Sequence, residues 1–341
     1  MKNFIKSHPI ISYTLITFAL SWFFWGSSIV VNFSDDIFLG VILVGGFGPA
    51  IAAFIMMHIQ SEKKITLGSN RLFWSFSFIA IVVVVVTYFL VQGSTDEAWG
   101  TSIWSGLKEP GLLAIFLITA CCLFWGLLVS NAYNGDLKEN FLTSFLFQNK
   151  KIKWYVFALL LFPAIYSLSF GVGKLLNFNT TEAIFSPDTN FFISFILTFI
   201  FTGGNEEFGW RGFFQKELQK KYSPLFSAFV IAIVWVLWHL PLHYNGFYPS
   251  EFSFTSRFAL GFQMALLYTW LYNKSGYSLL SVVILHAMYN NVSDIFGSSY
   301  VPAMSIGIVL VLIFIIEDKM WVKKSYHDNI YQSSALSQES T

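Results

Sequence analysis

Residues 191–214 read FFISFILTFIFTGGNEEFGWRGFF, and this stretch decides how the rest of the chain is interpreted. Its first part, 191–201, contains no charged residue, and Glu206, Glu207 and Arg211 follow it closely. Ionisable groups at membrane depth are costly, so they face a protein interior or a watery cavity and are functional candidates. The stretch therefore indicates a membrane protein with a polar site inside it.

The composition of the whole chain agrees with this interpretation. Of its 341 residues, 55% are hydrophobic and only 11% are charged, against roughly 25% in soluble domains. The net charge of +1 gives no support to a nucleic-acid partner. The two cysteines are neighbours in an apolar run, which excludes a disulfide framework.

The apolar runs predict an all-α, polytopic transmembrane helical bundle with about eight to ten spans, since each span needs about 20 apolar residues. The first run is too long for a cleaved signal peptide and is expected to be an uncleaved span. The expected spans are 9–31, 37–59, 72–91, 112–129, 154–176, 191–214, 225–243, 257–272, 278–291 and 301–316.

Lysine placement predicts the orientation of these spans, because cytoplasmic loops carry an excess of Lys and Arg. With ten spans, one set of loops is rich in lysine, and the alternate loops carry mostly acids. Both termini are therefore expected in the cytoplasm, with the protein in the cytoplasmic membrane. The lysine-rich segments contain Lys2, Lys6, Lys63, Lys64, Lys138, Lys150, Lys151, Lys153, Lys216, Lys220, Lys221, Lys274, Lys319, Lys323 and Lys324.

Two amphipathic stretches, 141–151 and 213–222, are expected to lie along the inner interface with their lysines toward lipid headgroups. The polar, serine-rich segment 325–341 is expected to be a disordered cytoplasmic tail.

The two carboxylates are expected to face different surroundings. Glu207 and Arg211 are i,i+4 neighbours with the acid first, the better order for an ion pair on a helix. Glu206 points about 100° away from Glu207, because a helix has 3.6 residues per turn. One carboxylate can therefore be neutralised while the other serves as a general base. The alternative is an ordinary charged cluster at the end of a span.

Two further polar pairs lie on later apolar segments. Trp235 precedes His239 by one helical turn, so its indole can pack against the imidazole and orient it. His286 and Asn290 also share one face and can together donate hydrogen bonds to a developing oxyanion. The alternatives are a satisfied core histidine and an interhelical polar contact.

These three pairs, taken in order, resemble the motifs of the CPBP superfamily. The matching residues are Glu206-Glu207-x-x-x-Arg211, then Trp235-x-x-x-His239, then His286-x-x-x-Asn290. The superfamily contains type II CAAX prenyl endopeptidases and bacterial Abi or bacteriocin-processing proteins. The resemblance covers residues 191–295, and Trp235 stands where the motif often has phenylalanine.

The resemblance implies an intramembrane endopeptidase with a conical cavity open toward the cytoplasm. Glu206 and His239 would hold and activate the attacking water, and His286 and Asn290 would stabilise the oxyanion. Glu207 with Arg211 would support the architecture. The substrate would be a C-terminal or membrane-proximal segment of a protein or peptide, prenylated in eukaryotic relatives.

The sequence leaves two alternatives open for cofactor dependence. A metal-free glutamate mechanism is expected, but Glu206, His239 and His286 could also be three zinc ligands of a metalloprotease. A non-enzymatic immunity or surface-protein-sorting protein is the alternative function.

The expected organisation has four parts. Residues 1–190 form the N-terminal transmembrane helices, 191–295 the catalytic membrane domain, 296–324 the final transmembrane helix, and 325–341 the tail. One feature fits poorly: His239 lies about 20 Å along its span at 1.5 Å per residue, deeper than the expected level of Glu206 and His286. A strong helix tilt or a wrong span boundary would reconcile them.

Overall fold

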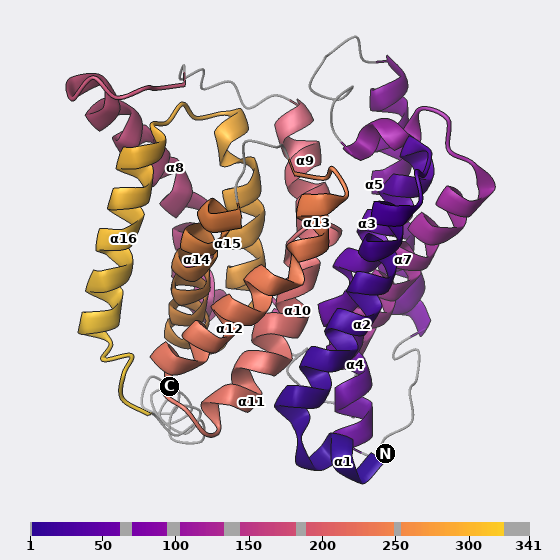
Figure 1. The fold of residues 1–341 in the computed structure, drawn as a ribbon, viewed down its shortest axis with the longest axis horizontal. Helices are drawn as coiled ribbons and strands as arrows, with labels where there is room; N and C mark the ends of the chain where they lie inside the picture. The colour runs from indigo at the N-terminus through magenta and orange to yellow at the C-terminus, as the bar shows by residue number, and fades with distance from the viewer. Residues whose placement is uncertain are drawn as a thin grey trace.

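The computed structural model describes residues 2–61, 70–93, 103–132, 144–181, 189–248 and 254–323. Regular structure throughout these residues is helical, and the helices pack side by side in one bundle (Figure 1). This confirms the predicted all-α fold class. The predicted tail, 325–341, lies outside the described residues, and the four-part division remains a prediction.

Seven stretches of the described residues are long and apolar enough to cross a membrane, which supports a multi-pass membrane protein. Four are single helices: α2 (Pro9–Val30), α5 (Asn70–Gly93), α7 (Leu112–Ala132) and α16 (Tyr300–Glu317). Three contain a change of helix type or direction. These are α3 (Asp35–Gly46) with α4 (Gly48–Ser61), η4 (Asn149–Lys151) with α8 (Ile152–Leu175), and α12 (Pro224–Trp238) with α13 (Leu240–Tyr244).

The remaining three expected spans are shorter or more polar. Helix α15 (Leu279–Asn291) is apolar but has only 13 residues, and α14 (Phe254–Lys274) contains Arg257 and the two amides Gln263 and Asn273. The expected span 191–214 is broken. It consists of α9 (Thr189–Ile200), η5 (Gly204–Glu206), α10 (Glu207–Gly209), the π-helical turn η6 (Trp210–Gln215) and α11 (Lys216–Gln219).

One end of the bundle carries most of the described lysines and is called the lysine-rich end below; Lys108 and Lys174 lie at the opposite end. Hydrogen bonds at the lysine-rich end join segments far apart in the chain. The backbone N–H of Leu225 donates to the Met320 carbonyl at 2.9 Å, and Lys151 Nζ donates to the Gly276 carbonyl at 2.8 Å. Helices α1 (Lys2–Ser7) and α11 lie at the same end, at the bottom of Figure 1. Its described lysines include Lys150, Lys151, Lys220, Lys221, Lys274, Lys319 and Lys323.

The other helix ends meet at the opposite end of the bundle. The backbone N–H of Thr181 donates to the Ser298 carbonyl at 2.9 Å, and Asn245 Nδ2 donates to Ser28 Oγ at 2.9 Å. The chain therefore passes back and forth between two ends, as the alternation of lysine-rich and acidic loops predicts.

The stretch 213–222 does not lie along the interface as expected. Phe213, Phe214 and Leu218 are 3%, 0% and 1% exposed, and α11 packs against α2 and α12. The apolar side of this stretch is covered by protein, so only its terminal lysines reach the interface. Of the other stretch, 141–143 lies outside the described residues, and Phe145 packs against Phe208 at a ring-centroid distance of 4.9 Å.

A tilted helix removes the mismatch in depth between the motifs. Helix α12 begins at Pro224, close to the expected boundary, and Ser223 Oγ caps it by accepting a hydrogen bond from the Phe226 N–H. It runs obliquely across the bundle, whereas α16 stands upright (Figure 1). The tilt brings the level of His239 closer to that of Glu206.

Candidate active site

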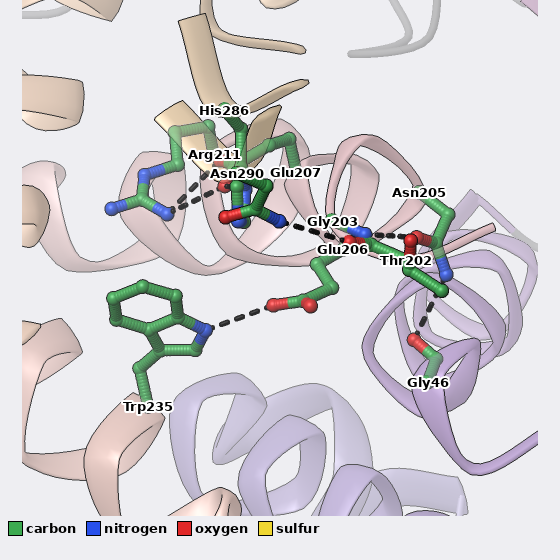
Figure 2. A network of polar contacts seen from close by, with 10 residues as sticks. All are labelled: Gly46, Thr202, Gly203, Asn205, Glu206, Glu207, Arg211, Trp235, His286 and Asn290. Carbon is green, nitrogen blue, oxygen red and sulfur yellow. Dashed lines mark hydrogen bonds and ion pairs between the residues drawn. The ribbon is translucent and has the colours of Figure 1, made fainter. Parts of the chain in front are cut away.

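A glycine turn delivers Glu206 to the interior. Helix α9 ends at Ile200, and Gly203 has φ +150°, a conformation that side-chain-bearing residues rarely adopt. The Gly203 N–H donates to Asn205 Oδ1 at 3.0 Å, and Asn205 Nδ2 donates to the Gly46 carbonyl at 3.0 Å (Figure 2). Asn205 thus ties the turn to the end of α3, and the next residue is Glu206.

Glu206 is fixed by a residue from another motif. Trp235 Nε1 donates to Glu206 Oε2 at 2.9 Å, and the glutamate is 8% exposed. Figure 2 shows the two side chains pointing toward each other from η5 and α12. The Trp235 ring also lies edge-on to His239, with ring centroids 5.2 Å apart. The sequence predicts this packing but not the bond to Glu206.

Glu207 has different partners. Arg211 donates to both of its oxygens, at 3.1 and 2.9 Å, and His286 Nδ1 lies 2.8 Å from Oε1. The Glu207 and Arg211 side chains are wholly buried, and the guanidinium lies over the Tyr268 ring at 5.0 Å. The expected i,i+4 ion pair is present, and it also holds a histidine of the third motif.

Both histidines have one ring nitrogen engaged. His239 Nδ1 lies 2.7 Å from the Trp235 carbonyl, which can only accept, so Nδ1 carries the proton. An ionised Glu207 likewise only accepts, so His286 Nδ1 donates to it. In each ring Nε2 is therefore the nitrogen available for chemistry. The edge of His286 that carries Nε2 faces Gly203, because a Cβ added there would lie 3.1 Å from this nitrogen.

Asn290 lies one helical turn after His286 on α15 and contacts the same glycine turn at residues 202–203. Its Nδ2 donates to the Thr202 carbonyl at 3.1 Å and lies 2.9 Å from the position of a Cβ added at Gly203. Unlike His239 and His286, which are 5% and 3% exposed, Asn290 is an exposed residue. The structure therefore brings Glu206, Trp235 and His239 together, and places His286 with Asn290 against the turn that precedes Glu206.

The donor set does not fit a three-ligand metal centre. Among the described residues, no three His, Cys, Asp or Glu side chains are grouped so that they could hold one ion. Glu206, His239 and His286 each contact Trp235. Its Nε1 donates to Glu206, and its ring lies 5.2 Å from the His239 ring and 5.9 Å from the His286 ring. No step proposed below passes through a metal.

Four residues near the site are missed by motif reasoning. Asn205 and Tyr268 are described above. Arg257 lies over the Tyr248 ring at 4.2 Å, and the Tyr248 ring lies 6.3 Å from that of His239. Burial raises the pKa of Tyr248 to about 12, so its phenol keeps its proton at neutral pH. An arginine at the start of an otherwise apolar segment is the signal that could have identified this pair.

Comparisons with known proteins point to the same segment. Residues 188–292 match the family model of type II CAAX prenyl endopeptidase Rce1-like proteins. CAAX prenyl protease 2 of Methanococcus maripaludis is 28% identical over 221 residues, which cover 61% of this chain and 79% of the relative.

The matched residues contain all three motifs in order, and the structure brings those motifs together at one buried turn. Residues 188–292 of this chain are therefore similar to the type II CAAX prenyl endopeptidases of the Rce1-like family, and the matching segment is the one whose motifs resemble the CPBP superfamily.

Proposed function

We propose that the protein is an intramembrane endopeptidase that hydrolyses a peptide bond with a water molecule activated by Glu206. One observation carries this proposal: two adjacent buried carboxylates have different partners. Arg211 and His286 engage Glu207, whereas Glu206 accepts its hydrogen bond from a neutral indole. Glu206 is therefore the carboxylate whose charge is not balanced by a direct ion pair, and it suits the role of general base.

The remaining residues take roles that follow from their geometry. Glu206 accepts a proton from water, the hydroxide attacks the carbonyl carbon, and the carbon–nitrogen bond breaks as the amine receives that proton. His239 Nε2 helps to hold the water. His286 Nε2 and the Asn290 amide stabilise the oxyanion, as preorganised donors do in acyl transfer.

To donate to the oxyanion from Nε2, His286 must carry a proton on each ring nitrogen, because its Nδ1 already donates to Glu207. Glu207 acts here through His286 and is a positioning residue.

The substrate we propose is a C-terminal or membrane-proximal segment of a protein or peptide. The name of the archaeal relative specifies a CAAX prenyl substrate for that protein. For this chain we propose a membrane-anchored or lipidated polypeptide, since the site lies within a membrane bundle. The lysine-rich end supports a location in the cytoplasmic membrane with both termini in the cytoplasm.

The test of function compares cells that carry Glu206→Ala with cells that lack the protein, at matched membrane abundance. The enzyme proposal expects the two to share one phenotype. Full complementation by Glu206→Ala would favour the alternative, a non-enzymatic immunity or sorting protein, in which the polar cluster only supports the fold.

The metal-free mechanism has its own test. Purified protein dialysed against a strong chelator should keep its peptidase activity and contain no stoichiometric zinc. Activity that is lost on chelation and restored by zinc would recast Glu206, His239 and His286 as ligands.

A further inference from the structure

His239 lies at a break between two helices. It follows α12 and precedes α13, and its ψ of −3° differs by about 40° from the helical value. The His239 N–H donates to the Val236 carbonyl at 3.2 Å, three residues back, so the helix tightens at this point. The Trp235 carbonyl, the regular partner four residues back, accepts instead from His239 Nδ1 at 2.7 Å. The break therefore sets the position of the imidazole as well as that of the backbone.

The break also releases the backbone carbonyl of Trp238 from the helix. In a continuous α-helix the Leu242 N–H would donate to this carbonyl, four residues back. Leu242 instead donates to the His239 carbonyl at 3.0 Å, and Pro241 has no N–H to offer. An unsatisfied carbonyl is costly inside a membrane bundle, so a donor from another segment is needed.

Helix α2 supplies that donor. Trp22 Nε1 donates to the Trp238 carbonyl at 3.0 Å, although the two residues are 216 positions apart in the chain. This carbonyl belongs to the peptide unit whose nitrogen is that of His239. Because a peptide unit is planar, fixing the carbonyl also fixes the direction in which the chain enters His239. The matched family segment begins at residue 188, so Trp22 lies outside it.

Two further turns of α2 contact the same break. The Trp25 ring centroid lies 4.4 Å from that of Trp238 and 6.3 Å from that of His239. Ser28 Oγ accepts a hydrogen bond at 2.9 Å from Nδ2 of Asn245, the residue that follows α13. These contacts recur every three residues along α2, so they lie on one side of the helix. That side of α2 holds the break from α12 to the end of α13.

We propose that α2 is a positioning element for His239 and that the Trp22 indole N–H is its central contact. Acting through the peptide unit before His239, this bond keeps Nδ1 on the Trp235 carbonyl. It thereby leaves Nε2 as the nitrogen that holds the water. The inference rests on the proposed function for the role of His239, but the state of its ring can be measured without activity.

Trp22→Phe tests the proposal, because it removes the indole N–H and keeps an aromatic ring beside Phe18, whose centroid is 5.0 Å away. Purified protein is labelled with ¹⁵N at histidine, and the His239 ring nitrogens are identified by their loss in His239→Gln. In the wild type we expect one tautomer, with the proton on Nδ1. In Trp22→Phe we expect a mixture of both tautomers, with kcat lower by about tenfold and KM unchanged.

Ser21→Ala is the matched control. Ser21 precedes Trp22 on α2 and is wholly buried, and its Oγ donates to the Gly45 carbonyl at 2.7 Å. The control variant therefore loses a comparable bond, but one that leads to α3. It should lower the thermal stability and leave the His239 signals and kcat as in the wild type.

The proposal is overturned if Trp22→Phe keeps the wild-type His239 signals and kcat. It is overturned equally if Ser21→Ala changes the His239 signals as much as Trp22→Phe does. If Trp22→Phe does not fold, Ser28→Ala takes its place and is judged by the same two outcomes. A changed His239 tautomer in a protein whose wild type has no peptidase activity would reject the proposed function and leave the positioning by α2 intact.

Discussion

At the scale of single residues, the site separates two carboxylates that are neighbours in the chain. Glu206 and Glu207 point in different directions because successive side chains on a helical turn are about 100° apart. Glu207 meets a guanidinium and an imidazole, whereas Glu206 meets the indole N–H of Trp235. The sequence alone predicts that they differ, since the Glu207–Arg211 spacing is local. It cannot predict the partner of Glu206, which is 29 residues away.

Trp235→Phe should lower kcat/KM by about 10- to 100-fold while membrane abundance stays unchanged, since 1.36 kcal/mol corresponds to one factor of ten. The change keeps an aromatic ring against His239 but removes a hydrogen bond to a carboxylate, worth about 1.5–3 kcal/mol. The measurement is peptidase kinetics on purified protein. Trp238→Phe is the matched control, because this wholly buried indole on the same helix has no hydrogen-bond partner for its Nε1. Equal losses in both variants would argue that the Trp235 bond is not important.

Glu207→Gln should destabilise the protein by about 3–5 kcal/mol, because it leaves the Arg211 guanidinium buried without an opposite charge. Thermal unfolding in detergent measures this loss. The double variant Glu207→Gln/Arg211→Met should regain most of the stability but stay inactive, since His286 still lacks a carboxylate at Nδ1. Recovery of activity in the double variant would contradict the positioning role of Glu207.

At the scale of elements, the break after α9 is the feature that local patterns do not reveal. Residues 191–214 are apolar enough to predict one continuous span. In the structure the chain instead turns at Gly203 and continues as η5, α10 and a π-helical turn. The two glycines at 203–204 permit this turn, but the Asn205 bond to Gly46 and the approach of α15 impose it. Those partners are distant in sequence, so hydrophobic periodicity carries no information about them.

Gly203→Ala should reduce both stability and activity. A residue forced into a sparsely populated backbone region costs about 1–3 kcal/mol, and the added Cβ would lie 2.9 Å from Asn290 Nδ2. We expect a loss of at least about tenfold in kcat/KM, since 1.36 kcal/mol corresponds to one factor of ten. Gly26→Ala is the control, because a Cβ there meets nothing within 4 Å. Wild-type activity in Gly203→Ala would show that the strained turn is not needed.

At the scale of the whole molecule, the sequence predicts the bundle and its alternating direction, because both follow from apolar length and lysine placement. It does not predict the layer of buried aromatic rings that follows Glu206. That depends on how Tyr13, Trp210, Phe214 and Tyr268 meet from three separate segments, and such contacts are fixed only by the assembled fold. The conical cavity and the four-part division remain predictions.

Reporter fusions test the orientation of the bundle. We expect cytoplasmic signals for fusions after lysines of the lysine-rich loops and external signals for fusions in the alternate loops. Among the described residues the cytoplasmic sites are Lys151 and Lys221, and the external site is Asn245. Lys64, Lys324, Asp96 and Asp188 extend the set but lie outside the described residues. An external signal after Lys221 would reverse the predicted orientation of the whole bundle.

The central claim is that Glu206 drives peptide-bond hydrolysis, and a comparison of protein and peptide termini tests it most directly. Cells that carry the wild-type protein are compared with cells that carry Glu206→Gln at equal membrane abundance. The glutamine keeps the volume and can accept the Trp235 hydrogen bond but is not a base, so hydrolysis should fall by about 10²–10⁴-fold. The account predicts a set of new termini, near membrane-proximal segments, that is present with the wild type and lost with Glu206→Gln. Identical termini in both strains, under every growth condition in which the protein is present, would contradict it.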